Sequence, residues 1–292
     1  MTYKQAVFKQ QIELFLISPI VRLGKIWGSL NKLSKQYTHF FFFPCADMGG
    51  SIKVNADIIK CVDSDKALII FSKKPQNNKF LSLFQNSGAD IIDLSSKIDN
   101  KAFHVVNIFY RGVLSSWMNS THSPVILGGE SLYFYKVIPF VKKPSTIIEL
   151  CHLNTWFNYS QAFITKITYR IFSTKKVKRD VEEQYKKNNI PPQYFSKLLF
   201  IDNAINIPYY INTKNNILQI VFVGRGAPQK RVHIIVEILE MAHKLNLPVH
   251  FTFVGDVEKY FSSETLKICT VLGEINDEQN YNRYIPIVIA LF

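Results

Sequence analysis

The chain has 292 residues, a formal net charge of +13, 47% hydrophobic residues and 20% charged residues. This composition excludes an intrinsically disordered chain, and the length allows two domains with ordinary cores. The positive charge favours anionic partners such as nucleoside diphosphates, nucleic acid or an acidic membrane face, although a solvated basic surface explains it equally well. The cysteines are widely scattered, so we expect reduced thiols of a cytoplasmic protein, with neither disulfides nor a cysteine metal site. They are Cys45, Cys61, Cys151 and Cys269.

Residues 1–37 are predicted to form a basic amphipathic N-terminal extension. The apolar stretch 12–21 is far shorter than a membrane-spanning helix, contains Glu13, and is not followed by a signal-peptide cleavage site. Further on, cationic residues gather on one helical face, and apolar residues share another. The apolar set is Ile20, Leu23, Ile26, Trp27, Leu30 and Leu33, and the cationic set is Arg22, Lys25 and Lys32. Such a helix either lies on an anionic leaflet or packs on the protein.

The next segment, 38–208, alternates strand and helix signals, which predicts a parallel sheet covered by helices on both faces. A helix is expected over residues 165–187. Strands are expected at residues 39–44, 67–71, 90–94, 101–107, 124–127, 145–150 and 198–201.

A polar stretch at 212–216 is typical of a linker, and a second strand–helix series opens at Gln219. We assign 209–292 to a second domain, with strands at 219–224, 249–254 and 265–271 and a helix over 232–246. This segment is short for a doubly wound domain and ends on an apolar run at 284–292. The predicted fold is therefore α/β with two Rossmann-like domains, the second incomplete.

Two loops that follow predicted strands are candidates for binding phosphate. Gly49 and Gly50 lie between a strand and a helix, where glycine allows the backbone to approach a ligand closely. Arg225 and Lys230 lie between a strand and the start of a helix, a position that suits a diphosphate. The alternatives are an ordinary turn for the glycines and a surface cation pair for Arg225 and Lys230.

Two further polar residues lie where strands are expected to end. His152 follows the strand over 145–150, where its imidazole could reach a substrate, or could be a structural histidine with satisfied hydrogen bonds. Asn203 follows the strand over 198–201, where asparagine either contacts substrate or forms a turn.

Together these motifs resemble the GT-B retaining glycosyltransferases of the group 1 (family 4) type. The matching segments are Gly49-Gly50, Glu149-Leu-Cys-His152, Ile201-Asp-Asn203-Ala-Ile205, Phe222-Val-Gly-Arg225 with Lys230, Phe253-Val-Gly255 and Gly273-Glu274-Ile275. The chain departs from the family pattern at Ala204, where glycine is usual, and at Ser51-Ile52, where Ala-Glu is frequent. The family's Glu-x7-Glu segment would lie beyond residue 292, so the resemblance implies a chain truncated within its second domain.

The resemblance also implies a role for each candidate residue. Arg225, Lys230, Gly49 and Gly50 would bind the donor diphosphate, and His152 would act near the reacting carbon. Other residues would lie near the nucleobase and the sugar: Gly255, Glu274, Ile275 and Asn203. The family needs neither a metal nor a cofactor for transfer.

The function implied is a hexosyl-type glycosyltransferase of bacterial cell-surface polysaccharide or lipopolysaccharide synthesis. It would use a nucleotide-sugar donor and a saccharide or lipid-linked acceptor, in the cytoplasm or on the inner face of the cytoplasmic membrane, with an anionic membrane surface as a partner. The alternative is a truncated, catalytically inactive remnant of such an enzyme. Nucleic acid is not expected as a partner, because the basic residues are dispersed and no nucleic-acid-binding motif occurs.

Overall fold

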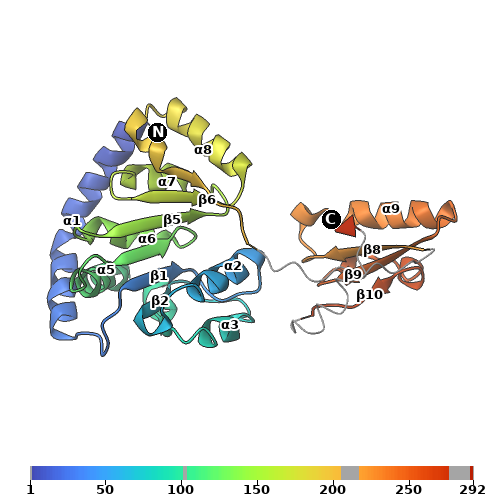
Figure 1. Cartoon of the computed structure of the whole chain (residues 1–292), viewed down its shortest axis with the longest axis horizontal. Helices are drawn as coiled ribbons and strands as arrows, with labels where there is room; N and C mark the ends of the chain where they lie inside the picture. Colours follow the sequence, from blue (N-terminus) through green and yellow to red (C-terminus); the bar gives the residue numbers. More distant parts are fainter. Residues whose placement is uncertain (1, 101–103, 205–216, 276–289, 292) are drawn as a thin grey trace. The chain divides into compact units, whose positions relative to one another are not determined.

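The computed structural model describes residues 2–100, 104–204, 217–275 and 290–291, and it divides the chain into two compact units (Figure 1). The first unit comprises residues 1–204 and the second residues 205–292. The predicted domain border after residue 208, the predicted linker at 212–216 and most of the apolar run at 284–292 lie outside the described residues.

The first unit is built on a parallel seven-stranded sheet in the order β3-β2-β1-β4-β5-β6-β7. The strands are β1 (His39–Phe43), β2 (Ala67–Phe71), β3 (Asp90–Asp93), β4 (Val125–Gly128), β5 (Thr146–Cys151), β6 (Tyr169–Phe172) and β7 (Leu198–Phe200). The chain moves outward from β1 through β2 and β3, and then returns to place β4 on the other side of β1. The topological switch point of this sheet therefore lies between β1 and β4.

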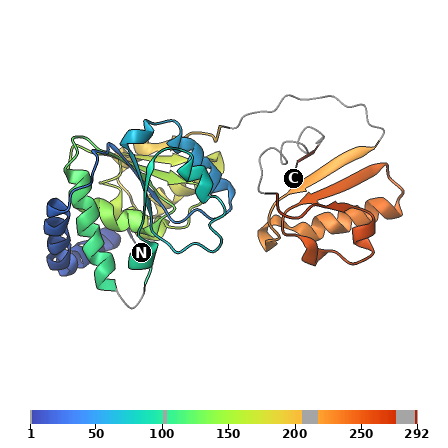
Figure 2. The same cartoon turned by 90° about the horizontal axis from the view of Figure 1, so that it is seen from below.

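Helices cover both faces of this sheet, which explains why β1 consists almost entirely of phenylalanine (Figure 2). Phe40 and Phe42 face a core that contains Leu114 of α5, whereas Phe41 and Phe43 face a second core. The helices are α2 (Gly50–Ile59), α3 (Leu81–Gln85), α4 (Ser95–Ile98), α5 (His104–Asn119), α6 (Leu132–Val137), α7 (Phe157–Ser160) and α8 (Lys175–Lys187). Short 3-10 turns are η1 (Ser64–Lys66), η3 (Ile138–Phe140), η4 (Gln161–Phe163) and η5 (Pro192–Lys197).

The chain begins with a long helix, α1 (Tyr3–Leu30), which runs along the edge of the first unit where the strands begin (Figures 1 and 2). A capping box formed by Thr2 and Gln5 starts it. It packs on α5 through small residues, among them Gly24 and Gly28, and leaves most of its large apolar residues exposed. Among the described residues no helix has the length and apolar character needed to cross a bilayer.

The second unit has a smaller parallel sheet in the order β10-β9-β8-β11. Its elements are β8 (Leu218–Val223), η6 (Pro228–Lys230), α9 (Val232–Lys244), β9 (Val249–Val254), η7 (Glu258–Tyr260), η8 (Thr265–Lys267), β10 (Thr270–Val271) and β11 (Ala290–Leu291). The buried side of α9 forms a core with Phe222 and Phe253 of the sheet. Since β9 and β11 lie on opposite sides of β8, the switch point here lies between β8 and β11.

Three sequence-predicted elements are wrong in type or extent. The strand predicted over 101–107 is, in its described part, the first turn of α5. Residues 165–187 are predicted as one helix, but the structure has the strand β6 within this range, and the helix α8 begins only at Lys175. The strand predicted over 265–271 is confined to Thr270 and Val271.

Candidate functional site

The loop after β1 places Gly49 and Gly50 at the start of α2, at the switch point of the first sheet. Gly49 is the N-cap of α2 and offers no side chain to its first amide groups. A Cβ on Gly50 would meet nothing within 4 Å, and one on Gly49 would only reach ordinary contact with Ile52. The start of α2 is therefore uncrowded beside both glycines, so the backbone there can approach a ligand closely.

Asp47 fixes the loop that carries these glycines. Its carboxylate accepts hydrogen bonds from the backbone N–H groups of Gln76, Asn77 and Asn78 at 2.9–3.0 Å. Partial burial opposes ionisation, but these three donors outweigh it and lower the pKa of Asp47 to about 2. The loop after β1 is thereby tied to the loop after β2.

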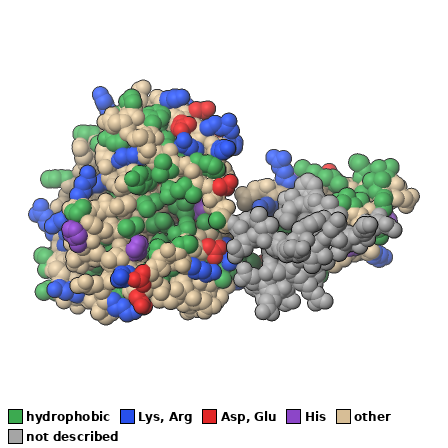
Figure 3. Space-filling view, in the orientation of Figure 1, with side chains coloured by type: hydrophobic (Ala, Val, Ile, Leu, Met, Phe, Trp, Pro, Cys, Tyr) green, Lys and Arg blue, Asp and Glu red, His purple; other side chains and the backbone are tan. Residues whose placement is uncertain are grey.

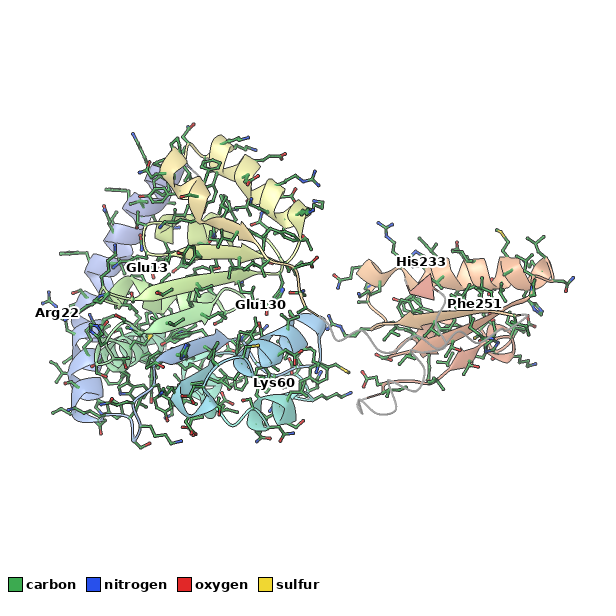
Figure 4. All side chains as sticks on the ribbon, in the orientation of Figure 1. Glu13, Arg22, Lys60, Glu130, His233 and Phe251 are labelled. Carbon is green, nitrogen blue, oxygen red and sulfur yellow. The ribbon has the colours of Figure 1, made fainter. Side chains whose placement is uncertain are left out.

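A buried polar cluster joins the two loops that flank the switch point. Asn55 of α2 is 1% exposed, and its Nδ2 donates to Oε2 of Glu130 at 3.2 Å. Glu130, labelled in Figure 4, is the second residue after β4. The backbone oxygen of Glu130 accepts from Nε1 of Trp156 at 3.2 Å. Neither Asn55 nor Glu130 is among the residues predicted from the sequence, although the strand before Glu130 is.

His152 belongs to the same cluster. Burial lowers the pKa of His152, and the negative charge of Glu130 opposes that shift only in part. The imidazole is therefore neutral at pH 7, with one donor and one acceptor nitrogen. Within the described part of the chain, Nε2 of His152 and Oδ1 of Asn55 are buried and have no hydrogen-bond partner. Each of these two atoms can therefore take a hydrogen bond from outside the protein, such as one with a water or a substrate.

Glu149, in the same sequence motif as His152, is part of the core. Its carboxylate forms a buried ion pair with Arg170 of β6 and accepts from the hydroxyl of Tyr135 at 2.6 Å. Cys151 also donates to this carboxylate, and burial raises the pKa of its thiol well above the usual value. This network fixes β5 against β6 directly before His152. All four cysteines are free.

Asn203 lies after β7 and is exposed, with its backbone N–H donating to the side chain of Asp202 at 3.0 Å. The first unit thus brings Gly49, Gly50 and His152 to the edge where its strands end, and Asn203 follows another strand at that edge.

In the second unit, cations surround the start of α9 beside its switch point. Arg225 follows β8 by two residues, Lys230 ends η6, and Arg231 is the N-cap of α9 in the left-handed conformation, with φ of 51°. All three side chains are exposed, and none pairs with an acidic side chain of the described part. Their charges are therefore available to an anion.

Close backbone contacts hold the strand ends of the second unit together. A Cβ on Gly255, where φ is 129°, would lie 1.9 Å from the carbonyl oxygen of Gly224, so this contact requires glycine. The N–H of Gly255 donates to the carbonyl oxygen of Gly273 at 2.6 Å. Glu274 and Ile275 follow directly, so the structure places them at the same sheet edge as Gly255 and the loop that begins with Gly224.

No cluster of three or more His, Cys, Asp or Glu side chains suited to a metal ion occurs among the described residues. The predicted metal independence therefore stays a prediction.

Comparison with known proteins identifies the fold. No family model matches the chain, and neither does any curated protein. Solved structures do match the chain, among them the apo form of the lipopolysaccharide outer core galactosyltransferase WaaB and the crystal structure of TarM. The WaaB match has 15% identity and a TM-score of 0.59, covering 87% of this chain and 72% of WaaB. The TarM match has 10% identity and a TM-score of 0.62, covering 88% of this chain and 80% of TarM. The predicted fold class is thereby confirmed: the chain has the α/β fold of the GT-B glycosyltransferases.

Proposed function

We propose that the chain is a glycosyltransferase of the retaining, family 4 type, which transfers a hexosyl group from a nucleotide-sugar to a saccharide or lipid-linked acceptor. The observation that carries the proposal is the group of exposed cations around the start of α9, at the switch point of a GT-B-type sheet. The similarity to WaaB, described as a lipopolysaccharide galactosyltransferase, supports a role in cell-surface polysaccharide or lipopolysaccharide synthesis.

On the donor side, Arg225 and Lys230 bind the diphosphate together with the first amide groups of α9. Cations placed where the leaving phosphate gains charge lower the barrier, and arginine suits phosphate oxygens because it can bind two of them at once. Gly255, Glu274 and Ile275 border the nucleobase and the sugar. Because these cations neutralise the diphosphate, we propose that neither a metal nor a cofactor is required.

On the acceptor side, Gly49 and Gly50 offer backbone amides and space for substrate. His152, neutral at pH 7, donates a hydrogen bond to the transferred sugar or to the departing phosphate. Asn203 contacts substrate from the end of β7. This part of the proposal rests on the unsatisfied Nε2 of His152 and on the open start of α2.

Calorimetric titration with UDP, ADP and GDP tests the donor assignment on the 292-residue chain. We expect Arg225→Ala to weaken the affinity for the nucleotide that binds best by about tenfold, because a hydrogen bond to a charged group typically contributes that much. Lys244→Ala is the matched control, since Lys244 is an exposed cation in the last turn of the same helix. Equal affinity of Arg225→Ala and the unchanged chain, or no binding of any of the three nucleotides, would overturn the proposal.

Transfer is measured separately, as release of labelled sugar from the matching nucleotide-sugar, with and without EDTA. We expect activity that EDTA leaves unchanged and that His152→Ala lowers about a hundredfold, with nucleotide affinity retained. Nucleotide binding without any transfer would instead favour the inactive alternative.

A further inference from the structure

Most of the large apolar side chains of α1 are exposed, although Trp27 also contacts the ring of Phe109 in α5 edge-on. At about 100° per residue they fall on one side of the helix, which we call the outer face of α1. Its members are Phe8, Ile12, Phe15, Leu16, Leu23, Ile26, Trp27 and Leu30. Phe15 is 80% exposed and Leu30 is 78% exposed. A continuous apolar stripe of this length on a surface helix indicates an interaction site.

The opposite side of α1 has no room for such residues. Ala6, Val21, Gly24 and Gly28 are buried there. A Cβ on Gly24 would lie 2.0 Å from the carbonyl oxygen of Phe109, and one on Gly112 of α5 would lie 2.1 Å from that of Val21. The two helix backbones therefore touch, so rotating α1 to bury its phenylalanines and leucines is sterically impossible. The outward orientation of the outer face is fixed by packing.

Cations that lack acidic partners lie beside the outer face. We call them the basic rim: Arg22, Lys25, Lys142, Lys143 and Lys166. Burial lowers the pKa of Lys25, and so do the neighbouring charges of Lys142, Lys166 and Arg22. None of the five forms an ion pair with another described residue.

The figures and a surface hollow place the outer face and the basic rim at one edge of the first unit. Figure 4 shows Arg22 on the outer side of α1, and Figure 3 shows hydrophobic and cationic side chains along the edge where α1 lies. A hollow of about 310 Å³ opens at the same edge, lined in part by Lys142 and Lys143 together with Thr121 and His122.

The charges decide which partner covers this surface. Glu13 is the only acidic residue of α1, and its carboxylate is paired with Arg111 at 3.1 Å. A second copy of the chain would bring another basic rim to a surface that has no free acidic group to receive it. An anionic bilayer satisfies both surfaces, because its acyl chains can contact the apolar residues of the outer face and its phosphates can contact the lysines of the basic rim.

We infer that the outer face of α1 and the basic rim form a docking surface for a bilayer that contains anionic phospholipid. The helix lies in the interface, with its apolar residues among the upper acyl segments and the basic rim among the headgroups. This inference does not depend on sugar transfer, because it uses the edge where the strands begin, whereas the candidate residues lie where the strands end.

Flotation of the 292-residue chain with vesicles tests the inference. The vesicles contain phosphatidylcholine alone or with roughly 30% phosphatidylglycerol, and we expect binding only to the second kind at physiological salt. The triple variant Phe15→Ser, Leu23→Ser, Leu30→Ser should weaken binding about tenfold or more, because the apolar contribution is lost. Removing charge with Arg22→Gln, Lys142→Gln, Lys143→Gln should have an effect of about the same size.

The matched control is Ile238→Ser, Met241→Ser, which removes exposed apolar residues of α9 and should leave binding unchanged. A second readout is quenching of tryptophan fluorescence by brominated lipid, which Trp27→Phe should remove. Equal binding to both kinds of vesicle, or equal loss in the α9 control, overturns the inference. So does a dimer in sedimentation that the triple α1 variant converts to monomer, since that result assigns the face to a second copy.

Discussion

A single carboxylate, that of Asp47, holds the loop that leads from β1 to the glycine pair. Three backbone donors from residues 76–78 converge on it, and their hydrogen bonds are charge-assisted because the carboxylate is ionised. The side chain remains partly exposed, so solvent screening reduces its contribution to stability.

We expect Asp47→Asn to lower the free energy of unfolding of the first unit by about 1 kcal/mol at pH 7, after allowing for that screening. The folded pKa of about 2 lies below the ordinary value of 3.8. The stabilisation is therefore complete above pH 3.8 and is lost as the pH falls towards 2. Urea unfolding at several pH values measures it. If the free energies of unfolding of Asp47→Asn and the unchanged chain differed by a constant amount down to about pH 2, the result would contradict this origin. Asp57→Asn is the control, because its carboxylate pairs only with exposed lysines.

At the residue scale, the positions of His152 and Arg225 follow from the apolar runs that precede them, and the structure places each after the expected strand. Their roles in binding and transfer stay predictions. The pairing of Glu130 with Asn55 cannot be predicted from the sequence, because the two residues are 75 positions apart and only the fold brings them together. The one signal in the sequence is an asparagine at a helix position where the apolar spacing predicts a buried residue.

At the scale of elements, close packing between α1 and α5 requires glycine at positions where helix propensity alone would favour alanine. Alanine is a better helix former than glycine by about 1 kcal/mol, so propensity alone predicts that Gly24→Ala stabilises α1. The new Cβ would instead meet the carbonyl oxygen of Phe109 in α5.

We therefore expect Gly24→Ala to destabilise the first unit by about 2 kcal/mol, a typical cost of overpacking at a contact that must separate. Thermal unfolding followed by circular dichroism measures the change. Ser29→Ala in the same helix is exposed and should alter stability by less than about 0.5 kcal/mol. A stabilised Gly24→Ala would mean that the two helices separate at little cost.

The differences between the predicted and the observed elements have specific physical reasons. Residues 104–107 include two adjacent β-branched valines, which favour a strand locally, but the buried positions that follow continue at helical spacing through Met118. The strand β6 contains a buried arginine, Arg170, which reads as a surface residue of a basic helix. Arg170 can be buried because it pairs with Glu149 of β5, and this tertiary contact cannot be read from the local sequence.

At the scale of the whole molecule, each unit has a core of its own. Ile59 is fully buried in a core of the first unit, and Leu239 is buried in that of the second. No residue belongs to core clusters of both units within the described ranges.

We therefore predict two unfolding transitions in differential scanning calorimetry. Ile59→Ala should lower the midpoint of one transition and Leu239→Ala that of the other, each through a loss of about 2–5 kcal/mol. A single transition that both substitutions shift equally would show that the units unfold together.

The packing of α1 on α5 also has a consequence for biosynthesis. α1 ends at Leu30 and α5 ends at Asn119, so at about 5–20 residues per second the ribosome adds the intervening 90 or so residues in roughly 5–20 s. During that interval the nascent helix exposes both its glycine side and its apolar stripe. The apolar stripe and the glycine side of α1 are therefore translated before the helix that covers the glycine side.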